Sequence, residues 1–386
     1  MSEHERRPAP LRIEEVRSRR DLRRFIDVPW HIYRDDPNWV PPLIMERRDH
    51  LDRRKNPFFQ TAEAKFWLAL RGGQAVGRIS AQVNRRHLER YGDATGHFGF
   101  IEGEDDPAVF AGLTQAAEQW LAGQGMERIT GPFSFSINDE AGLLVEGFDS
   151  PPYMMMGHAR PYYAQRLQAL GYRPLKDLVT YLADREAVLP RVVERLVKKA
   201  EAGGRVTVRP LDMRRYPQEL RTIMDIFNDA WAENWGFIPF SEADIAYLAK
   251  NIKPLIDPDY IAIAEFDGEP AAMAVMLPNL NEIIADLDGR LLPFGWAKLL
   301  WRLKVAGVRS ARMPLMGVRR KFQSGPMGAS LAFIAIHAVR RDLMAKGVER
   351  AELSWVLEDN RPVRSIIESI GARLGKTYRI YEKALT

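Results

Sequence analysis

The order of predicted helices and strands in the first half of the chain is repeated in the second half. Each half begins with a strand and a helix, continues with a two-stranded hairpin that turns through glycine, at 71–74 and again at 267–269, and ends with a helix followed by a strand. A solenoid unit is only about 20 to 50 residues long, so units of this size indicate duplication of a domain. Two domains also suit 386 residues, because a single hydrophobic core rarely grows beyond roughly 250 to 300 residues.

The link between the halves is predicted to be a helix. Between residues 187 and 204 apolar residues recur at helical spacing, and Gly203 and Gly204 end the segment. The predicted organisation is therefore a first lobe at 1–186, a connecting helix at 187–204 and a second lobe at 205–386.

The composition is that of a folded protein without cysteine chemistry. Hydrophobic residues make up 46% and charged residues 28% of the chain, which supplies enough apolar surface to offset the chain entropy lost on folding. The absence of cysteine excludes disulfides, a thiolate nucleophile and cysteine-ligated zinc, and we expect no metal cofactor. Residues 1–24 lack the apolar core of a signal peptide, and no run of about 18 apolar residues occurs. We therefore expect a cytoplasmic protein.

The net charge is mildly positive. A formal charge of +5 and a pI near 9.3 favour anionic partners, a group that includes phosphorylated cofactors, acidic lipid surfaces and nucleic acid. Charge alone does not choose among them. The chain lacks a nucleic-acid recognition motif, so we expect no nucleic acid as a partner.

A small-residue turn in the second half is predicted to bind phosphate. The strand before it leads into Gln323-Ser324-Gly325-Pro326-Met327-Gly328-Ala329, and a helix follows. Backbone N–H groups at the positive end of a helix bind a compact dianion such as a pyrophosphate if no side chain blocks them. Gly325 and Gly328 allow this approach, and Arg319, Arg320 and Lys321 would raise the local positive potential. An ordinary strand-to-helix turn is the alternative.

This strand, turn and helix resemble those of the GNAT acyltransferase family, whose turn has the pattern R/Q-x-x-G-x-G/A. Pro326 departs from the pattern and the glycine stands one place early, at Gly325, whereas Gly328 keeps the last position. The segment 365–372 is similar to the terminal helix of the family. The resemblance therefore covers about 205–386.

The first lobe is similar to a degenerate member of the same family. Its segment 162–172 looks like the terminal helix of the family. The turn at 101–107, however, carries four acidic residues where a pyrophosphate would have to bind, and like charges repel.

The resemblance implies a fold, a co-substrate and a site. The fold is α/β, or α+β in stricter usage, with two GNAT-like lobes that each contain a mixed, largely antiparallel central sheet flanked by helices. The co-substrate is acyl-CoA, bound by the second lobe. The tandem arrangement is similar to a bacterial group that includes ceramide synthases, which acylate the amine of a sphingoid base. The implied acyl-CoA residues are Met316, Gly317, Val318, Gln323, Ser324, Gly325, Met327, Gly328 and Ala329.

Amide formation requires that the acceptor amine lose its proton, since an ammonium has no lone pair with which to attack a thioester. Two carboxylates are candidate bases. Glu233 lies among tryptophans, and desolvation by them would raise its pKa toward neutrality, while Glu358 follows the predicted strand at 353–357. A position on the surface is the alternative for each of them.

Three further side chains have candidate roles near the end of the chain. Asn360 either orients the acceptor or caps the helix that follows it. Ile367 stands where the family often has a tyrosine acid, so Tyr378, or Tyr381 near it, is the candidate replacement, with packing as the alternative. His337, on the helix after the turn, is interpreted as a packed core histidine.

An insertion separates the second hairpin from the strand that follows it. The family needs only a short turn there, whereas 279–310 intervene. Within this insertion, 291–305 is basic, aromatic and aliphatic, with Trp296, Leu299 and Leu303 at helical spacing, which indicates an amphipathic helix. Such a helix suits peripheral contact with the inner membrane surface, and packing against the protein or a partner chain is the alternative.

These expectations describe an N-acyltransferase in which an amine attacks the thioester of an acyl-CoA directly, with a long-chain sphingoid base as the acceptor. One alternative is a tandem transferase that acts on a small amine, a peptide or an aminoacyl-tRNA. Another is a ligand-binding scaffold without catalytic activity. Acyl-chain preference distinguishes the first alternative from lipid acylation, and turnover of any acyl-CoA excludes the second.

Overall fold

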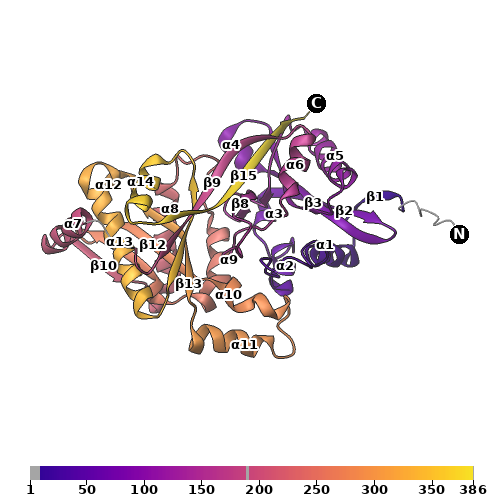
Figure 1. The fold of residues 1–386 in the computed structure, drawn as a ribbon. Coiled ribbons are helices and arrows are strands. Elements are labelled where there is room, and N and C mark those ends of the chain that lie inside the picture. Colours follow the sequence, from indigo (N-terminus) through magenta and orange to yellow (C-terminus); the bar gives the residue numbers. More distant parts are fainter. Residues whose placement is uncertain (1–8, 188–190, 386) are drawn as a thin grey trace. The chain divides into compact units, whose positions relative to one another are not determined.

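The computed structural model describes residues 9–187 and 191–385, which form two compact units (Figure 1). The N-terminal unit contains the residues up to Asp177 together with those from Thr377 onward, and the C-terminal unit is Leu178–Lys376. The division passes through two long strands, β9 (Arg173–Asp184) and β15 (Arg373–Ala384). Each of these strands begins in one unit and ends in the other.

The N-terminal unit is built on a sheet with the strand order β1-β2-β3-β4-β5-β15, in which β8 also pairs with β15. Neighbouring strands are antiparallel apart from β4 and β5, which are parallel. The strands are β1 (Leu11–Glu15), β2 (Ala62–Arg71), β3 (Gln74–Asn84), β4 (Thr95–Gly103), β5 (Arg128–Gly131) and β8 (Leu143–Glu146), and β6 (Phe133–Ser134) pairs separately with β7 (Glu140–Ala141). The helices are α1 (Arg19–Ile32), α2 (Ile44–His50), α3 (Phe58–Thr61), α4 (Arg85–Tyr91), α5 (Pro107–Gly123) and α6 (Tyr162–Ala169).

The C-terminal unit has a sheet with the order β10-β11-β12-β13-β14-β9. Its strands are antiparallel apart from the parallel pair β13 and β14. The strands are β10 (Val206–Pro210), β11 (Ile261–Phe266), β12 (Glu269–Pro278), β13 (Ser310–Val318) and β14 (Arg350–Leu357), together with β9. The helices are α7 (Arg191–Ala202), α8 (Tyr216–Ala230), α9 (Glu242–Ile252), α10 (Leu280–Ile284), α11 (Gly295–Trp301), α12 (Arg320–Gln323), α13 (Gly325–Ala345) and α14 (Arg361–Ser369). The predicted fold class, a mixed and largely antiparallel sheet flanked by helices in each unit, is confirmed.

The unit boundaries follow strand pairing, which differs from the order of elements along the chain. The predicted boundaries assign all of β9 to the first lobe, which ends at 186, and all of β15 to the second lobe, which begins at 205. In the structure, the second part of β9 pairs with β14 in the C-terminal unit. The last part of β15 pairs with β5 and β8 in the N-terminal unit. Each sheet is thus completed by a strand from the other half of the chain. Of the predicted connecting helix, 188–190 lie outside the described residues and α7 occupies Arg191–Ala202.

The longest helix, α13, is apolar around most of its circumference. One face packs on β11 and β12 and buries Leu331, Ile334 and Ala335. His337 is exposed, so its interpretation as a packed core histidine is wrong, because it lies on the part of the helix that faces solvent. A further apolar face of α13 lines a pocket and is described below.

The insertion between β12 and β13 consists of α10, a 3-10 turn, α11 and a short π-helical turn at Arg302–Ala306 (Figure 1). The regular helix is therefore shorter than the predicted span of 291–305. Asp286 pairs with Arg302 at 2.6 Å and also with Lys298, which holds α11 against the turn after α10. Among the described residues, no helix combines the length and the apolar character needed to cross a bilayer.

Candidate active site

The parallel strands β13 and β14 part in the middle of the C-terminal sheet. Their pairing runs from Ser310 opposite Arg350 to Met313 opposite Leu353 and stops there, while β13 stays paired with β12 as far as Val318. The remainder of β13 therefore has an edge that β14 does not cover. This edge opens a cleft in the sheet.

Two tryptophans line the cleft. The indole N–H of Trp231, at the end of α8, donates to the carbonyl oxygen of Met316 on β13 at 3.0 Å. The same indole packs edge-to-face on Trp355 of β14, with ring centroids 5.6 Å apart. The carbonyl oxygen of Met316 has no partner on β14, because β14 has already separated from β13. A carbonyl group inside a protein needs a hydrogen-bond donor, and the indole of Trp231 supplies it.

The first turn of α13 borders the same opening. Gln323, Gly328 and Ala329 line a pocket together with Met316, Gly317 and Val318 of β13. The helix is 21 residues long, and its cap residue Ser324 makes no side-chain capping bond. The first N–H groups of a helix lack intrahelical partners and carry partial positive charge, so this turn can bind an anion. Ser324 and Met327 of the predicted site are exposed on this turn, and Gly325 is the first residue of the helix.

Gly328 is required by the close approach of two backbone segments. A Cβ atom at this position would lie 2.7 Å from the carbonyl oxygens of Phe322 and Gln323. No side chain fits there without moving the end of α12. The glycine therefore fixes the turn whose N–H groups are available to a ligand.

The basic residues beside the turn are each paired with a carboxylate. Arg319 binds Asp225 at 2.6 Å, Arg320 binds Asp229 at 3.3 Å, and Lys321 binds Glu269. The positive potential that the sequence predicts here is thus largely offset. The backbone N–H groups of α13 are left as the main attraction for a phosphate.

The corresponding turn of the N-terminal unit is filled by its own ion pairs. The side chain of Asp106 accepts from the N–H of Ala108 and caps α5, which is the place that a ligand phosphate would need. Asp105 binds Arg166 at 2.7 Å, and Glu102 pairs with the buried Arg78 at 2.5 Å. That this unit is degenerate stays a prediction.

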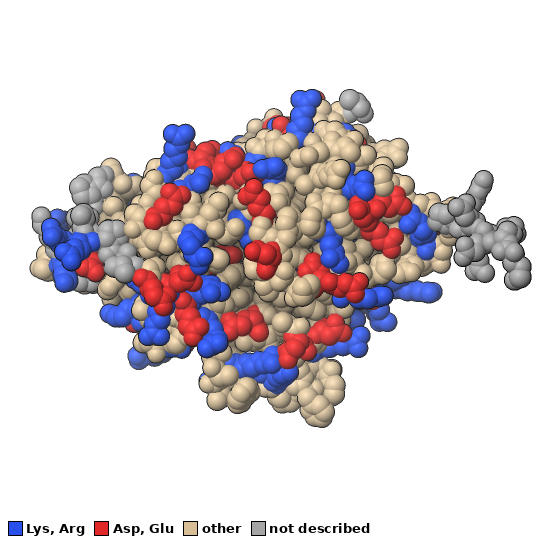
Figure 2. All heavy atoms as spheres, viewed as in Figure 1, with Lys and Arg blue, Asp and Glu red and all other residues tan. Residues whose placement is uncertain are grey.

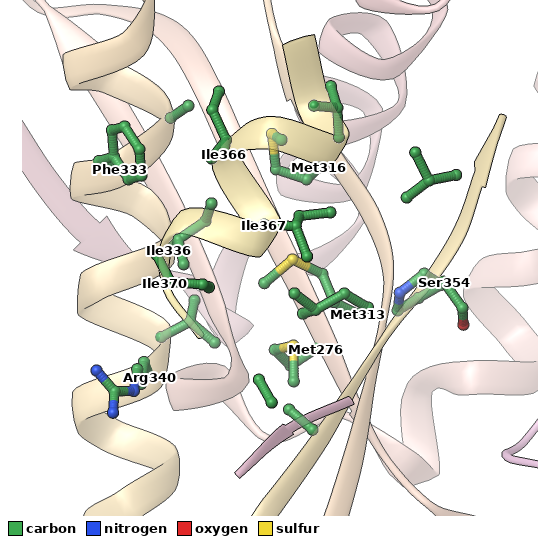
Figure 3. A pocket seen from close by; sticks show the side chains of 18 of the residues that line it. Met276, Met313, Met316, Phe333, Ile336, Arg340, Ser354, Ile366, Ile367 and Ile370 are labelled. Atoms are coloured by element: carbon green, nitrogen blue, oxygen red, sulfur yellow. The ribbon is translucent and has the colours of Figure 1, made fainter. Parts of the chain in front are cut away.

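The pocket of the C-terminal unit continues from the turn into an apolar cavity of about 560 Å³. Figure 3 shows Phe333, Ile336 and Arg340 following one another along α13, opposite the isoleucines of α14. The methionines Met276, Met313 and Met316 come from the sheet. Ile366 and Ile367 of α14 and its C-terminal cap residue Ile370 complete the apolar wall.

Polar groups lie mainly at the two ends of the cavity. The end where β13 and β14 separate has the polar residues Asn234, Gln323, Ser354 and Asn360. Asp184, Arg185, Arg340, Glu349 and Arg350 belong to the other end. Between them the lining is hydrocarbon and thioether, so the middle of the cavity suits an apolar ligand.

The predicted base Glu233 is not part of this pocket. Its side chain is 83% exposed and binds Arg320 at 3.1 Å. The neighbouring Trp231 turns into the cleft and does not cover the carboxylate, so the desolvation that the sequence predicts for Glu233 is absent.

The candidate catalytic residues that follow β14 differ from one another in exposure and in whether they line the pocket. Glu358 is exposed, and its backbone carbonyl accepts from Arg364 at 2.7 Å. Asn360 lines the pocket, and its side chain accepts from the N–H of Val363 at 3.3 Å, which makes it the N-cap of α14. Ile367 points into the pocket, so this position supplies no acid (Figure 3).

Tyr378 belongs to the N-terminal unit, whereas the pocket lies wholly in the C-terminal unit. It is fully buried on β15, opposite Leu144 of β8. Tyr381 is likewise buried on β15, opposite Gly131. Packing in the last strand, the alternative stated above, accounts for both positions.

A buried polar cluster that the sequence reading missed lies beside the point where the strands part. The hydroxyl of Ser354 donates to Glu352 at 2.7 Å and accepts from Nε of Arg312 at 2.7 Å. Glu352 is 1% exposed, and burial raises the pKa of its carboxyl, while Arg312, Ser354, Lys376 and Thr180 act in the opposite direction. The sequence signal available for this cluster was a charged residue among the apolar residues of each segment, Arg312 in β13 and Glu352 in β14.

The charged side chains do not gather in one patch on the face shown in Figure 2. On the face shown in Figure 2, basic and acidic side chains are interspersed, and most of the surface that projects over α11 is neither. The net charge of +5 therefore gives no single basic patch on this face.

Two curated proteins match nearly the whole chain, while no family model matches it. The chain is 50% identical over 378 residues to the protein of Caulobacter vibrioides (strain NA1000 / CB15N) named bacterial ceramide synthase, and the match covers 98% of each chain. It is 46% identical over 373 residues to Protein YghO of Escherichia coli (strain K12), covering 95% of this chain and 94% of that protein.

Solved structures with the same fold are more distant in sequence. A tandem GNAT protein from the clavulanic acid biosynthesis pathway matches with a TM-score of 0.56 at 12% identity, over 98% of this chain and 99% of that one. A GCN5-related N-acetyltransferase from Sphaerobacter thermophilus matches with a TM-score of 0.53 at 14% identity, over 98% and 97%. At such identities the likeness shows the fold alone.

Replacing Gly328 by alanine is expected to weaken coenzyme A binding at least about ten-fold, or about 1.4 kcal/mol, because the added Cβ displaces the turn before α13. Titration calorimetry with coenzyme A measures this change. Gly123→Ala is the matched control, since nothing lies within 4 Å of its added Cβ. If both variants bind coenzyme A as the wild type does, the phosphate binds elsewhere.

Proposed function

We propose that this chain, which belongs to the family of tandem GNAT-like N-acyltransferases that includes the bacterial ceramide synthase of Caulobacter vibrioides, transfers an acyl group from acyl-CoA to the amine of a long-chain sphingoid base. Family membership and N-acyltransferase activity follow from 50% identity over 98% of the chain, as the sequence predicts. The donor and the acceptor are the proposal. The observation that carries them is the apolar cavity that continues from the anion-binding turn of α13.

The donor is proposed to bind along α13 and β13. Its pyrophosphate would take the first N–H groups of α13, where the helix dipole favours negative charge. The two amides of its pantetheine arm can pair with the edge of β13 that β14 leaves uncovered. This arrangement would bring the thioester to the point where the strands part, near Met313 and Leu353.

The chemistry proposed is direct attack. The neutral amine nitrogen adds to the thioester carbonyl carbon, the carbon–sulfur bond breaks, and the coenzyme A thiolate leaves and takes up a proton. Because an ordinary thiol has a pKa of about 8.5, this thiolate leaves without strong acid assistance. The reaction therefore tolerates Ile367 at the position of the tyrosine acid, and its main requirement is a group that accepts the amine proton.

Ser354 and Glu352 are the proposed proton acceptors. Ser354 lines the pocket, and its hydroxyl is already hydrogen-bonded to the Glu352 carboxylate at 2.7 Å. A proton taken up by the hydroxyl oxygen can pass to the carboxylate in one step. Burial raises the pKa of Glu352 toward the range in which a base works at neutral pH. Glu233 and Glu358, the sequence-based candidates, have exposed side chains.

The insertion supports a proposal of contact with a membrane surface. Its large apolar side chains are exposed, from 49% for Leu300 to 80% for Phe294. Several exposed apolar side chains in one short segment favour an interaction surface, and tryptophans with nearby basic residues suit the headgroup region of a bilayer. Lys304 is exposed beside them. A sphingoid base resides in such a bilayer, so the proposed acceptor and the proposed surface agree.

Purified protein supplied with palmitoyl-CoA and sphinganine is expected to form the N-palmitoyl amide and one equivalent of free coenzyme A. Mass spectrometry detects the amide and a thiol reagent measures the coenzyme. Acylation of small amines from acetyl-CoA without any lipid product would favour the small-amine alternative. Absence of turnover with every acyl-CoA would favour a ligand-binding scaffold.

Glu352→Gln is expected to lower kcat/KM at least about 100-fold, the usual contribution of a general base, with little change in acyl-CoA affinity. Ser354→Ala should cause a similar loss, because it removes the hydroxyl that links the pocket to Glu352. Because Glu352 accepts the proton only when ionised, wild-type kcat/KM should rise with pH through its raised pKa, and this rise should vanish in Glu352→Gln. A greater loss in Glu233→Gln or Glu358→Gln than in Glu352→Gln would reassign the base.

Replacing Leu292, Phe294 and Trp301 together by serine is expected to abolish sedimentation with vesicles of phosphatidylglycerol and phosphatidylethanolamine, because these exposed side chains supply the apolar contact. Leu374→Ser, at another exposed apolar position of the C-terminal unit, is the matched control and should sediment like the wild type. Equal sedimentation of the triple variant would show that the insertion does not bind lipid.

A further inference from the structure

Helix α13 has two apolar faces, and each meets a different part of the C-terminal unit. The first face packs on β11 and β12. The second carries Phe333, Ile336 and Val339 and borders the cavity of about 560 Å³. Residues at this spacing share one side of a helix, so the second face is continuous. An amphipathic helix would have placed polar residues there.

Helix α14 presents a matching apolar face from the other side. Val363, Ile366, Ile367 and Ile370 recur at helical spacing and all line the cavity. Figure 3 shows these isoleucines opposite Phe333 and Ile336. An apolar cavity between two such faces offers water few hydrogen-bond partners and therefore favours a hydrocarbon ligand.

The cavity has the length of one fatty acyl chain. From Phe333 to Met344, both of which line it, α13 advances eleven residues at about 1.5 Å each, or about 16 Å. One lipid chain spans half of the roughly 30 Å hydrocarbon core of a bilayer, or about 15 Å. The two lengths are similar, so the cavity suits a hydrocarbon chain of about this length.

The cavity is continuous with the turn at the start of α13, and this favours the acyl tail of the donor over the long chain of the acceptor as its ligand. Gln323, Gly328 and Ala329 line the same pocket as the apolar residues deeper along the helix. In an acyl-CoA, the phosphate group and the acyl tail belong to one molecule, so a ligand anchored at this turn can extend its tail along α13. The charged and hydroxylated head of a sphingoid base would find few polar partners in the middle of the cavity.

The far end of the cavity is lined by polar groups. The guanidinium of Arg340 donates to the backbone carbonyl of Arg185 at 2.9 Å and to that of Ala187. Arg350 binds Asp184 at 3.1 Å at the same end. A chain long enough to reach these groups would meet charged side chains that hydrocarbon cannot hydrogen-bond, which is unfavourable.

We propose that this cavity, the acyl channel, holds the fatty acyl tail of the donor, and that Ile336, Ile370 and Arg340 limit the length of the tail that it accepts. The proposal rests on the function proposed above, because it assigns the tail of the same acyl-CoA. It assigns the channel to the donor alone and leaves the long chain of the acceptor outside it.

The test introduces bulk into the acyl channel and compares donors. Ile336→Trp places a larger side chain opposite Ile370, while His337→Trp adds the same side chain one residue away, on the exposed side of α13. Titration calorimetry with coenzyme A and with palmitoyl-CoA gives the gain in affinity due to the tail. Turnover of palmitoyl-CoA, octanoyl-CoA and acetyl-CoA gives the chain-length profile.

We expect the wild type and His337→Trp to bind palmitoyl-CoA at least ten-fold more tightly than coenzyme A. Ile336→Trp should lose most of this gain, keep its affinity for coenzyme A, and move the preferred donor from palmitoyl-CoA toward octanoyl-CoA. Ile370→Ala should shift the preference toward longer chains. These results would support the acyl channel.

The proposal is overturned if Ile336→Trp binds coenzyme A normally and keeps the wild-type gain with palmitoyl-CoA, because the tail then lies elsewhere. It is also overturned if the wild type shows no such gain. A wild type that shows the gain but turns over no acyl-CoA would instead refute the proposed function and leave the acyl channel in place. The two failures are therefore distinguishable.

Discussion

The parting of β13 and β14 is the constraint on which the rest of the C-terminal unit depends. A sheet that stops pairing in its interior leaves backbone donors and acceptors that must find other partners. Trp231 supplies one of them by donating to Met316. The remaining edge faces the opening of an apolar cavity, so the fold provides polar backbone groups and hydrocarbon walls side by side. An acyl-CoA, with its amide arm and its acyl tail, has the same sequence of polar and apolar parts.

The features that the sequence predicted well are local ones. The hairpin at β11 and β12 turns through Asp267 and Gly268, which both have positive φ, as a two-residue turn between such strands requires. The turn before α13 was identified from its glycines, and Gly328 proves necessary because two backbone carbonyls approach it closely. In such cases residues near one another in sequence determine the local structure, so a short sequence motif is enough to predict it.

The features that the sequence did not reveal depend on distant pairing or on burial. Nothing local in β9 or β15 indicates that each strand completes the sheet of the other unit. Glu233 was chosen because tryptophans flank it, but adjacency in sequence does not cover a carboxylate, and it is exposed. Glu352 alternates with apolar residues on a strand and is buried by groups from other strands. Its environment becomes visible only when Arg312 and Lys376 are placed beside it.

A tail held in the acyl channel would change what limits the reaction. Each buried methylene contributes up to about 0.8 kcal/mol, but the tail keeps the same contacts while the thioester reacts, so this binding lowers KM without raising kcat. The amide product retains the tail and gains the second chain of the acceptor. Its release therefore depends on a medium that accepts hydrocarbon, which a bilayer does and water does not. The exposed apolar residues of the insertion belong to the same unit as the channel and would keep that unit at such a surface. On this argument, contact with a membrane matters for product release as much as for the supply of the acceptor.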